Sequence, residues 1–185
     1  NRAQKATEAG YFKTQITPVM LKSKKGDVAY ETDEHFRPNA VLADMTKLKP
    51  VFIKENGTVT AGNACPLNDG AAGVVVMSDT LAKELGLTPL ARIVSSGVSG
   101  LNPEIMGLGP VEAIKQALGR ANMSIDDIDL VEINEAFAAQ VLPSADELGI
   151  PMDKLNTRGG SIALGHPFGM TGARIMTTLI HNLQT

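Results

Sequence analysis

The sequence is poor in cysteine, contains no tryptophan and has little excess charge of either sign. One cysteine in 185 residues, Cys65, excludes an internal disulfide framework and is typical of a reducing compartment. The formal net charge of −3 argues against the broad basic surface that nucleic acids require. No apolar run approaches the length of a membrane span, and the longest, residues 71–77, suits a buried strand. We therefore expect a cytoplasmic protein with neither a nucleic-acid partner nor a membrane span.

From residue 67 onward, apolar segments of strand length alternate with segments of helical pattern. We predict strands at 71–77, 91–95 and 130–133 and helices at 79–85, 110–121 and 136–148. Pro143 is expected to bend or break the last helix. Residues 1–66 are more polar and irregular, with a short helix at 2–9, an extended stretch at 16–21 and a turn at 23–27. The alternation of strands and helices predicts a layered α/β domain.

A glycine-rich segment near the C-terminus surrounds a single histidine. Five glycines lie between Gly159 and Gly172, with His166 among them and an amphipathic run directly after. Glycine lets the backbone come close to another segment or to a ligand. The start of a helix disfavours an imidazolium, so we expect a neutral ring that can accept a proton. The alternative is a histidine satisfied inside a tight turn, but the glycines and the lack of a nearby carboxylate favour an active-site loop.

Two further segments could contribute to a site. Residues 134–138 lie at a strand-to-helix junction, where ligands of α/β proteins usually bind. The simpler interpretation is that Asn134 is a helix N-cap and Glu135 a first-turn acid. Residues 60–72 are small and turn-forming, so a ligand could lie against their backbone. Here the simpler interpretation is a tight loop that enters a buried strand, with Cys65 packed rather than reactive.

Together these three segments resemble the thiolases, the family of acetyl-CoA acetyltransferases and 3-ketoacyl-CoA thiolases. The spacing matches as well, with 69 residues from Cys65 to Asn134 and 32 from Asn134 to His166. The resemblance implies an α/β fold of the thiolase-like five-layered αβαβα type, present here only in part. The segments it implies are the latter part of a substrate-covering loop domain (1–66), the last strand and helix of the N-terminal core half (67–88) and a truncated C-terminal core half (89–185).

The resemblance also implies the chemistry. Thiolases carry out a reversible Claisen condensation, or thiolytic cleavage, of 3-ketoacyl-CoA, with coenzyme A as a substrate and no further cofactor. By likeness, His166 activates a nucleophilic cysteine and, together with Asn134 acting through a water, stabilises a thioester oxyanion. Neither cysteine of the family's mechanism has a match in this chain, so we expect the isolated chain to be inactive. Thiolases are typically dimers or tetramers, and we expect a homo-oligomer.

Contacts to coenzyme A follow from the same likeness. Arg37 matches an arginine near the nucleotide, where its guanidinium suits a phosphate or a stacked adenine. Cys65 stands where relatives commonly have a serine that touches the pantetheine arm, so we expect it to contact CoA rather than to be the nucleophile. The remaining residues expected along the pantetheine arm are small or apolar: Phe52, Ala64, Met106, Ala136 and Phe137. The alternative for Phe52 and Met106 is plain core packing.

Other functions remain to be weighed. Decarboxylating condensing enzymes share this fold, but the run Asn134–Phe137 combined with the run Gly165–Pro167 favours a thiolase. A non-catalytic acyl-CoA-binding protein is a further alternative. The three histidines share no metal-ligand spacing, and we predict no metal site.

Overall fold

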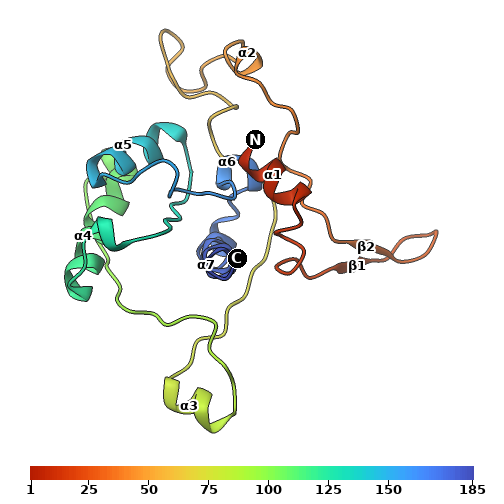
Figure 1. Cartoon of the computed structure of the whole chain (residues 1–185). Coiled ribbons are helices and arrows are strands. Elements are labelled where there is room, and N and C mark those ends of the chain that lie inside the picture. The colour runs from red at the N-terminus through yellow and green to blue at the C-terminus, as the bar shows by residue number, and fades with distance from the viewer.

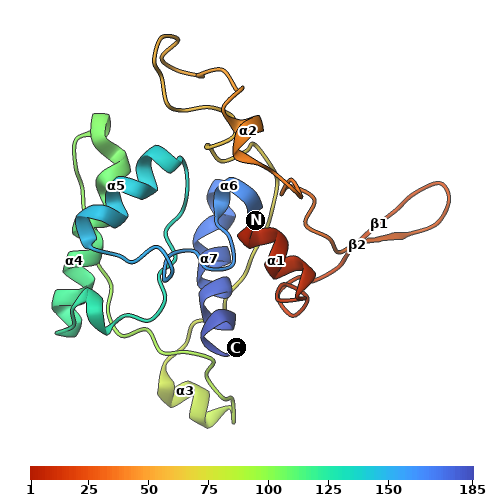
Figure 2. The same ribbon diagram turned by 45° about the horizontal axis from the view of Figure 1, so that its top comes forward.

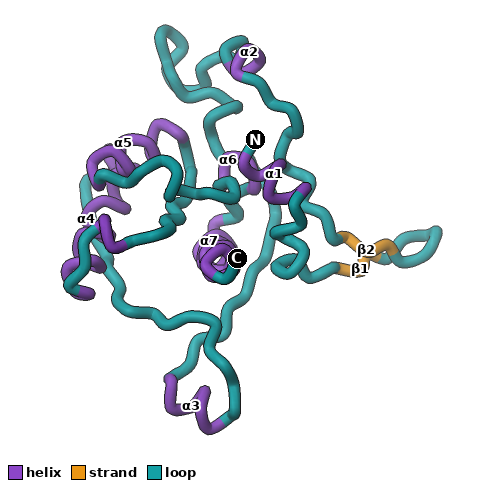
Figure 3. Tube along the Cα trace, in the orientation of Figure 1, coloured by secondary structure: helices purple, strands orange, loops and turns teal.

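The computed structural model describes all 185 residues, and long connections separate its helices (Figures 1 and 3). The helices are α1 (Arg2–Glu8), α2 (Leu42–Met45), α3 (Asp79–Glu84), α4 (Gly109–Ala121), α5 (Ala138–Leu148), α6 (Ser161–Leu164) and α7 (Phe168–Leu183), with 3₁₀ turns η1 (Pro103–Leu108) and η2 (Ile125–Asp127). The only strands are β1 (Val19–Leu21) and β2 (Val28–Tyr30), an antiparallel pair in which Met20 faces Ala29. None of the helices combines the length and the apolar character needed to cross a membrane.

The larger packed unit consists of α4, α5 and the segments that follow each of them. Its buried core is made of Val111, Ile133, Val141, Ala145, Leu148, Ile150 and Leu155. Pro110 lies in the first turn of α4, where its missing N–H costs nothing. Asn122, at φ +54°, ends that helix in the left-handed conformation. Helix α5 starts at Ala138, two residues later than predicted, and continues through Pro143, so the proline does not break it.

A smaller unit joins the N-terminus to the glycine-rich segment. Helix α1 lies beside α6, and both are close to α7 (Figure 2). The buried contacts there are Ala3, Ala6, Phe12 and Leu164. Gly159 has φ +96°, and a Cβ at this position would lie 2.7 Å from the Cβ of Ala3. The close approach of α1 therefore requires glycine at position 159.

The strands predicted at 71–77, 91–95 and 130–133 do not form within this chain. The first two segments are long connections to and from α3 that carry no strand ladder (Figure 1). The third has one parallel bridge, between Val131 and Leu155. A strand needs a hydrogen-bonding neighbour along its length, and these 185 residues supply none for the first two segments and a single bridge for the third. The side chains of the first two segments are uncovered as a result, with Val75 85% and Ile93 62% exposed.

Local sequence signals predicted three of the helices correctly. The helices predicted at 2–9, 79–85 and 110–121 form within about one residue of their expected bounds. Ser78 caps α3, because its hydroxyl accepts a hydrogen bond from the N–H of Leu81 at 3.1 Å. The extended stretch at 16–21 is a strand only at 19–21, and the predicted turn at 23–27 connects it to β2.

Candidate active site

Two of the three predicted site segments lie side by side. An isolated antiparallel bridge joins Ala64 to Phe137. The N–H of Cys65 donates to the carbonyl of Ala136 at 2.9 Å, and the N–H of Ala138 donates to the carbonyl of Asn63 at 2.8 Å. The small side chains of 60–72 thus allow this loop to run against the segment that leads into α5.

His166 lies in the three-residue link between α6 and α7. Its backbone N–H donates to Oδ1 of Asn68 at 3.0 Å, which ties the histidine loop to the 60–72 loop. The preceding Gly165 has φ +97°, a conformation that favours glycine, and a Cβ there would overlap the Asn68 side chain. All three predicted segments therefore meet at His166.

The imidazole is held at both nitrogens. Nε2 lies 3.1 Å from Nδ2 of Asn134, and Nδ1 lies 2.7 Å from the hydroxyl oxygen of Thr171. The Thr171 hydroxyl donates its one proton to the carbonyl of Pro167 at 2.9 Å, so Nδ1 must be the donor in its contact with Thr171. Nε2 then carries the lone pair. Burial, and secondly the charge of Arg174, lower the pKa of His166 below 6.5, so the ring is neutral at physiological pH.

Asn134 is not a helix cap, which overturns the simpler interpretation of this residue. The N-cap of α5 is Phe137, three residues further on, and no side chain caps that helix. The amide oxygen of Asn134 instead accepts a hydrogen bond from the Ser161 hydroxyl at 2.6 Å. Ser161 in turn accepts one from Nη2 of Arg174 at 2.9 Å. Asn134 therefore lies between the histidine and a buried polar chain.

Glu135 and Asn156 fix the segment that carries Asn134. Asn156 is buried, and its amide bonds both the N–H and the carbonyl of Ile133 at 2.9 Å. The same amide donates to Glu135 at 2.9 Å, and the other carboxylate oxygen of Glu135 accepts the N–H of Ile162 at 3.1 Å. Glu135 therefore links this segment to α6 rather than acting as a first-turn acid of α5. A Cβ on Gly160 would overlap its carboxylate, so that position too must be small.

A buried pair of ionisable groups lies behind the site. The carboxylate oxygens of Glu132 and the Nε and Nη1 atoms of Arg174 are buried without a hydrogen-bond partner. Burial raises the pKa of Glu132 to about 7, against the opposing attraction of Arg174. The carboxylates of Glu135 and Asp33 also attract the Arg174 guanidinium. The guanidinium is thus surrounded by acidic groups, while its one hydrogen bond is to Ser161.

Five of the residues expected to contact CoA come together. The ring of Phe52 meets that of Phe137 edge to face, with centroids 5.8 Å apart and an interplanar angle of 76°. The bridged backbone of Ala64, Cys65 and Ala136 lies directly beside this pair. Phe52 is 67% exposed within these 185 residues. Burial raises the pKa of the Cys65 thiol, which disfavours its thiolate.

Two other residues of that set stand apart. Met106 lies on η1 and is exposed, and Arg37 is exposed as well. No hydrogen bond, ion pair or aromatic contact joins either residue to the Phe52–Phe137 pair. Within this chain, Met106 and Arg37 therefore do not lie at the site.

Sequence reasoning missed several residues that support the imidazole: Asn68, Asn156, Ser161, Thr171 and Arg174. One of them left a readable signal. Arg174 is a charged residue directly before the apolar run that predicts α7, and it lies three residues after Thr171, on the same side of the helix. This spacing gives the face of the helix that Arg174 occupies but not its partner Ser161, which lies 13 residues away.

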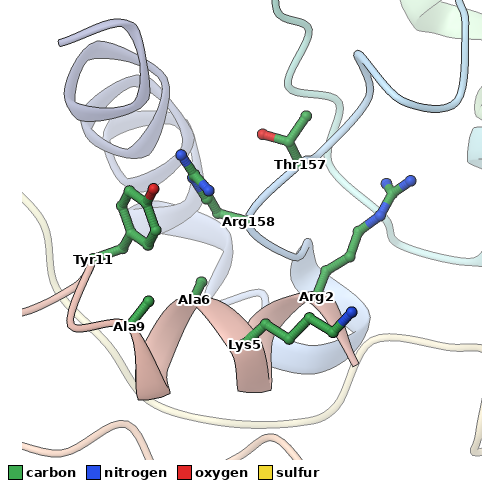
Figure 4. A pocket seen from close by; sticks show the side chains of 7 residues that line it. All are labelled: Arg2, Lys5, Ala6, Ala9, Tyr11, Thr157 and Arg158. Atoms are coloured by element: carbon green, nitrogen blue, oxygen red, sulfur yellow. The ribbon is translucent and has the colours of Figure 1, made fainter. Parts of the chain in front are cut away.

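A separate hollow of about 250 Å³ lies between α1 and residues 157–158 (Figure 4). Arg2, Lys5 and Arg158 give it a basic lining. Two of these cations already bind protein groups. Arg2 donates to the carbonyls of Met152 and Leu155, while Arg158 stacks 3.5 Å from the centre of the Tyr11 ring and donates to Asn182. These cations fasten α1 and the end of α7 to the rest of the chain, and we assign the hollow no ligand.

Comparison with known proteins gives a consistent result along the whole chain. Residues 1–80 match the family model described as "Thiolase, N-terminal domain" and residues 87–185 the model described as "Thiolase, C-terminal domain". A beta-ketothiolase of Cupriavidus necator is 55% identical over 182 residues, which cover 98% of this chain and 46% of the relative. A cytosolic acetyl-CoA acetyltransferase of Mus musculus is 50% identical over 185 residues, covering 100% of this chain and 47% of the relative.

Solved structures agree with these relatives. The acetyl-CoA acetyltransferase of Bacillus anthracis is 50% identical and superposes with a TM-score of 0.95 over 99% of this chain and 46% of its own. Human mitochondrial 3-ketoacyl-CoA thiolase in complex with CoA is 46% identical, with a TM-score of 0.90 over 99% of this chain and 45% of its own. The chain therefore spans about half the length of the proteins it matches. With both family models matched and the α/β fold shared, the chain belongs to the thiolase family.

Proposed function

We propose that the protein carrying this chain is a thiolase, which transfers acyl groups to and from CoA and joins or cleaves 3-ketoacyl-CoA. One observation carries the proposal. A neutral imidazole presents a bare Nε2, and the amide of Asn134 lies 3.1 Å from that nitrogen. A base next to a hydrogen-bond donor suits a reaction in which a thiol loses its proton and negative charge then develops on a carbonyl oxygen.

The two side chains divide this chemistry between them. Nε2 of His166 accepts the proton of a thiol, and the thiolate attacks the acyl carbon of the substrate. The imidazolium that forms, together with the Asn134 amide, stabilises the thioester oxyanion, in the manner that the family resemblance implies. We do not assign the attacking thiol to Cys65, because burial raises the pKa of this group and disfavours its thiolate. The nucleophile is a further cysteine outside these 185 residues.

The apolar surface around Phe52 and Phe137 supports a binding site for the pantetheine arm of CoA. A narrow amide-containing chain suits a strip of small residues and aromatic edges, because only small side chains let it approach the backbone. Ala64, Cys65 and Ala136 are small enough to form the floor of such a strip. We propose that Arg37 and Met106 also contact CoA, Arg37 at the nucleotide, as the family resemblance implies.

The test is CoA-dependent cleavage of acetoacetyl-CoA by the intact protein that carries this chain. Replacing His166 by Asn removes the base, and we expect kcat to fall by about 10²–10⁴-fold. His181→Asn is the matched control, because that ring lies near the end of α7 and contacts only Thr14 at 3.4 Å. Turnover only with release of carbon dioxide from a malonyl donor would contradict the proposal in favour of a decarboxylating condensing enzyme. CoA binding without turnover would indicate a non-catalytic acyl-CoA-binding protein.

We further propose a cytoplasmic homodimer or homotetramer that takes part in fatty-acid metabolism. The oligomer rests on the family resemblance, and the location is supported by the Mus musculus relative, whose name places it in the cytosol. Light scattering after size-exclusion chromatography would test the first point and cell fractionation the second. A monomer, or recovery in an organelle, would contradict the respective part.

A further inference from the structure

The hydrogen bonds behind Asn134 have only one consistent direction. A guanidinium has donors and no acceptor, so the Ser161 hydroxyl must accept the bond from Arg174 at 2.9 Å. The single proton of that hydroxyl is then free to donate to Oδ1 of Asn134 at 2.6 Å. Ser161 is 0% exposed, so bulk solvent does not reach either bond.

This direction decides how the Asn134 amide is turned. With Oδ1 facing Ser161, Nδ2 faces His166 and offers a proton to Nε2 at 3.1 Å. A flipped amide would bring its oxygen to the bare Nε2, where two acceptors would face each other without a proton. It would also bring an N–H group to a hydroxyl that already accepts from Arg174. With the ring proton on Nδ1, the histidine end then loses its hydrogen bond, and at the other end the proton of the Ser161 hydroxyl loses its acceptor in a buried place.

The hydrogen bonds on the Nδ1 side of the His166 ring lead independently to the same position of the ring proton. Thr171 donates to Pro167 and accepts from Nδ1, so the ring proton sits on Nδ1. A continuous series of donors thus runs from Arg174 through Ser161, Asn134 and His166 to Thr171. The first member, the Arg174 guanidinium, cannot accept a hydrogen bond, and the last acceptor, the carbonyl of Pro167, cannot donate one. The direction of the whole series is therefore fixed at both ends.

We propose that Arg174 and Ser161 are positioning residues, which orient the Asn134 amide and thereby keep the proton of His166 on Nδ1 and leave Nε2 unprotonated. The proposal rests on the proposed function, since a bare Nε2 is the state needed by the base. Neither residue touches the reacting atoms, and they act through Asn134. Arg174 suits this role because the acidic groups around it, Glu132, Glu135 and Asp33, hold its charge in the interior.

The experiment measures the protonation of the ring directly. In the intact protein with ¹⁵N-labelled histidine, the chemical shifts tell the protonated nitrogen from the bare one, and the His166→Asn spectrum identifies the His166 signals. We expect a neutral ring with Nδ1 protonated in the wild type. Protonation of Nε2 in the neutral wild-type ring overturns the proposal without any variant.

Ser161→Ala removes the central hydroxyl, so the Asn134 amide can turn. The Nδ1 proton is then held from the Thr171 side alone, and the neutral form protonated at Nε2 gains population. We expect kcat to fall about tenfold with KM within about twofold, less than for loss of the base itself. Ser144→Ala is the matched control, because Ser144 is also 0% exposed and its hydroxyl bonds only the carbonyls of Gly107 and Gln140 on η1 and α5. A Ser161→Ala protein that keeps the wild-type ¹⁵N shifts and kcat overturns the proposal, as does an equal change in Ser144→Ala.

The two proposals fail in different ways. A protein that does not cleave acetoacetyl-CoA, but whose His166 shows a bare Nε2 that is lost in Ser161→Ala, contradicts the thiolase assignment and leaves the positioning role intact. A protein that cleaves acetoacetyl-CoA but has a protonated Nε2 in its resting ring contradicts the positioning role and leaves the thiolase assignment intact.

Discussion

The charge of Arg174 reaches His166 through space as well as through hydrogen bonds. Burial and then this charge lower the pKa of the imidazole, so its neutral form persists below pH 6.5. We expect the acid limb of kcat/KM to lie below that value. Arg174→Gln removes the charge, raises the pKa of His166 and moves the limb to higher pH. A pH–rate profile of both proteins checks this, with Arg158→Gln as the control, and an unmoved limb would contradict it.

Glu132 makes stability depend on pH in the opposite sense from an ordinary carboxylate. Its pKa is about 7 in the fold against 4.5 without burial, so between these values the folded state holds a proton that the unfolded state releases. The free energy of unfolding therefore decreases as the pH rises from 4.5 to 7. Relative to Glu132→Gln, which does not titrate, we expect a decrease of up to about 3 kcal/mol. Urea unfolding of both proteins at pH 5 and pH 8 measures this decrease. If the difference in unfolding free energy between the wild type and Glu132→Gln is the same at both pH values, the prediction is refuted.

Cys65 tests the assignment of the nucleophile. Its backbone N–H bonds the carbonyl of Ala136, and burial raises the pKa of its thiol, so a serine can fill the same place. We expect Cys65→Ser to keep the cleavage of acetoacetyl-CoA by the intact protein within a few-fold of wild type. A loss of several orders of magnitude would make Cys65 the nucleophile.

At the scale of elements, the corner between α6 and α7 depends on Gly165. An alanine there would adopt φ +97° and overlap the Asn68 side chain. We expect Gly165→Ala to lower the free energy of unfolding by more than about 1 kcal/mol and to reduce activity, because Asn68 also holds the backbone of His166.

Gly172 provides the contrast on the neighbouring helix. It lies inside α7, and a Cβ there would meet nothing within 4 Å. Because alanine is the better helix former, Gly172→Ala should raise the free energy of unfolding by up to about 1 kcal/mol. Thermal melts of the two variants should therefore shift in opposite directions. A shift in the same direction would show that the corner tolerates a side chain.

At the scale of the whole molecule, much apolar surface lies uncovered. Only 20 of the 185 residues are buried, and the runs around Val75 and Ile93 face solvent. Surfaces of this kind are covered in a stable protein by other segments or other chains. We expect the 185-residue chain produced alone to associate, to bind a hydrophobic dye and to show no thiolase turnover. A monodisperse, active 185-residue protein in light scattering and assay would contradict this.

The sequence predicted those features whose causes are local. Ser78 and Pro110 mark helix starts by their own chemistry, and the resemblance of three short motifs to the thiolases indicated the site. The strand at 71–77 could not be realised, because a strand is defined by a neighbour that these residues do not contain. Ser161 and Arg174 were missed for a related reason. Their partners lie 27 and 13 residues away in sequence, and no short pattern encodes such a contact.

The carbonyl of Pro167 ends the series of donors in a group that can release no proton, and this has a consequence for isotope exchange. A hydrogen taken up at Nε2 cannot be relayed inward through Thr171 to the interior, nor back through Asn134 to Arg174. It can leave only by the face on which it arrived. His166 therefore exchanges the hydrogen it removes only at Nε2, with whatever reactant or solvent molecule meets that face of the ring.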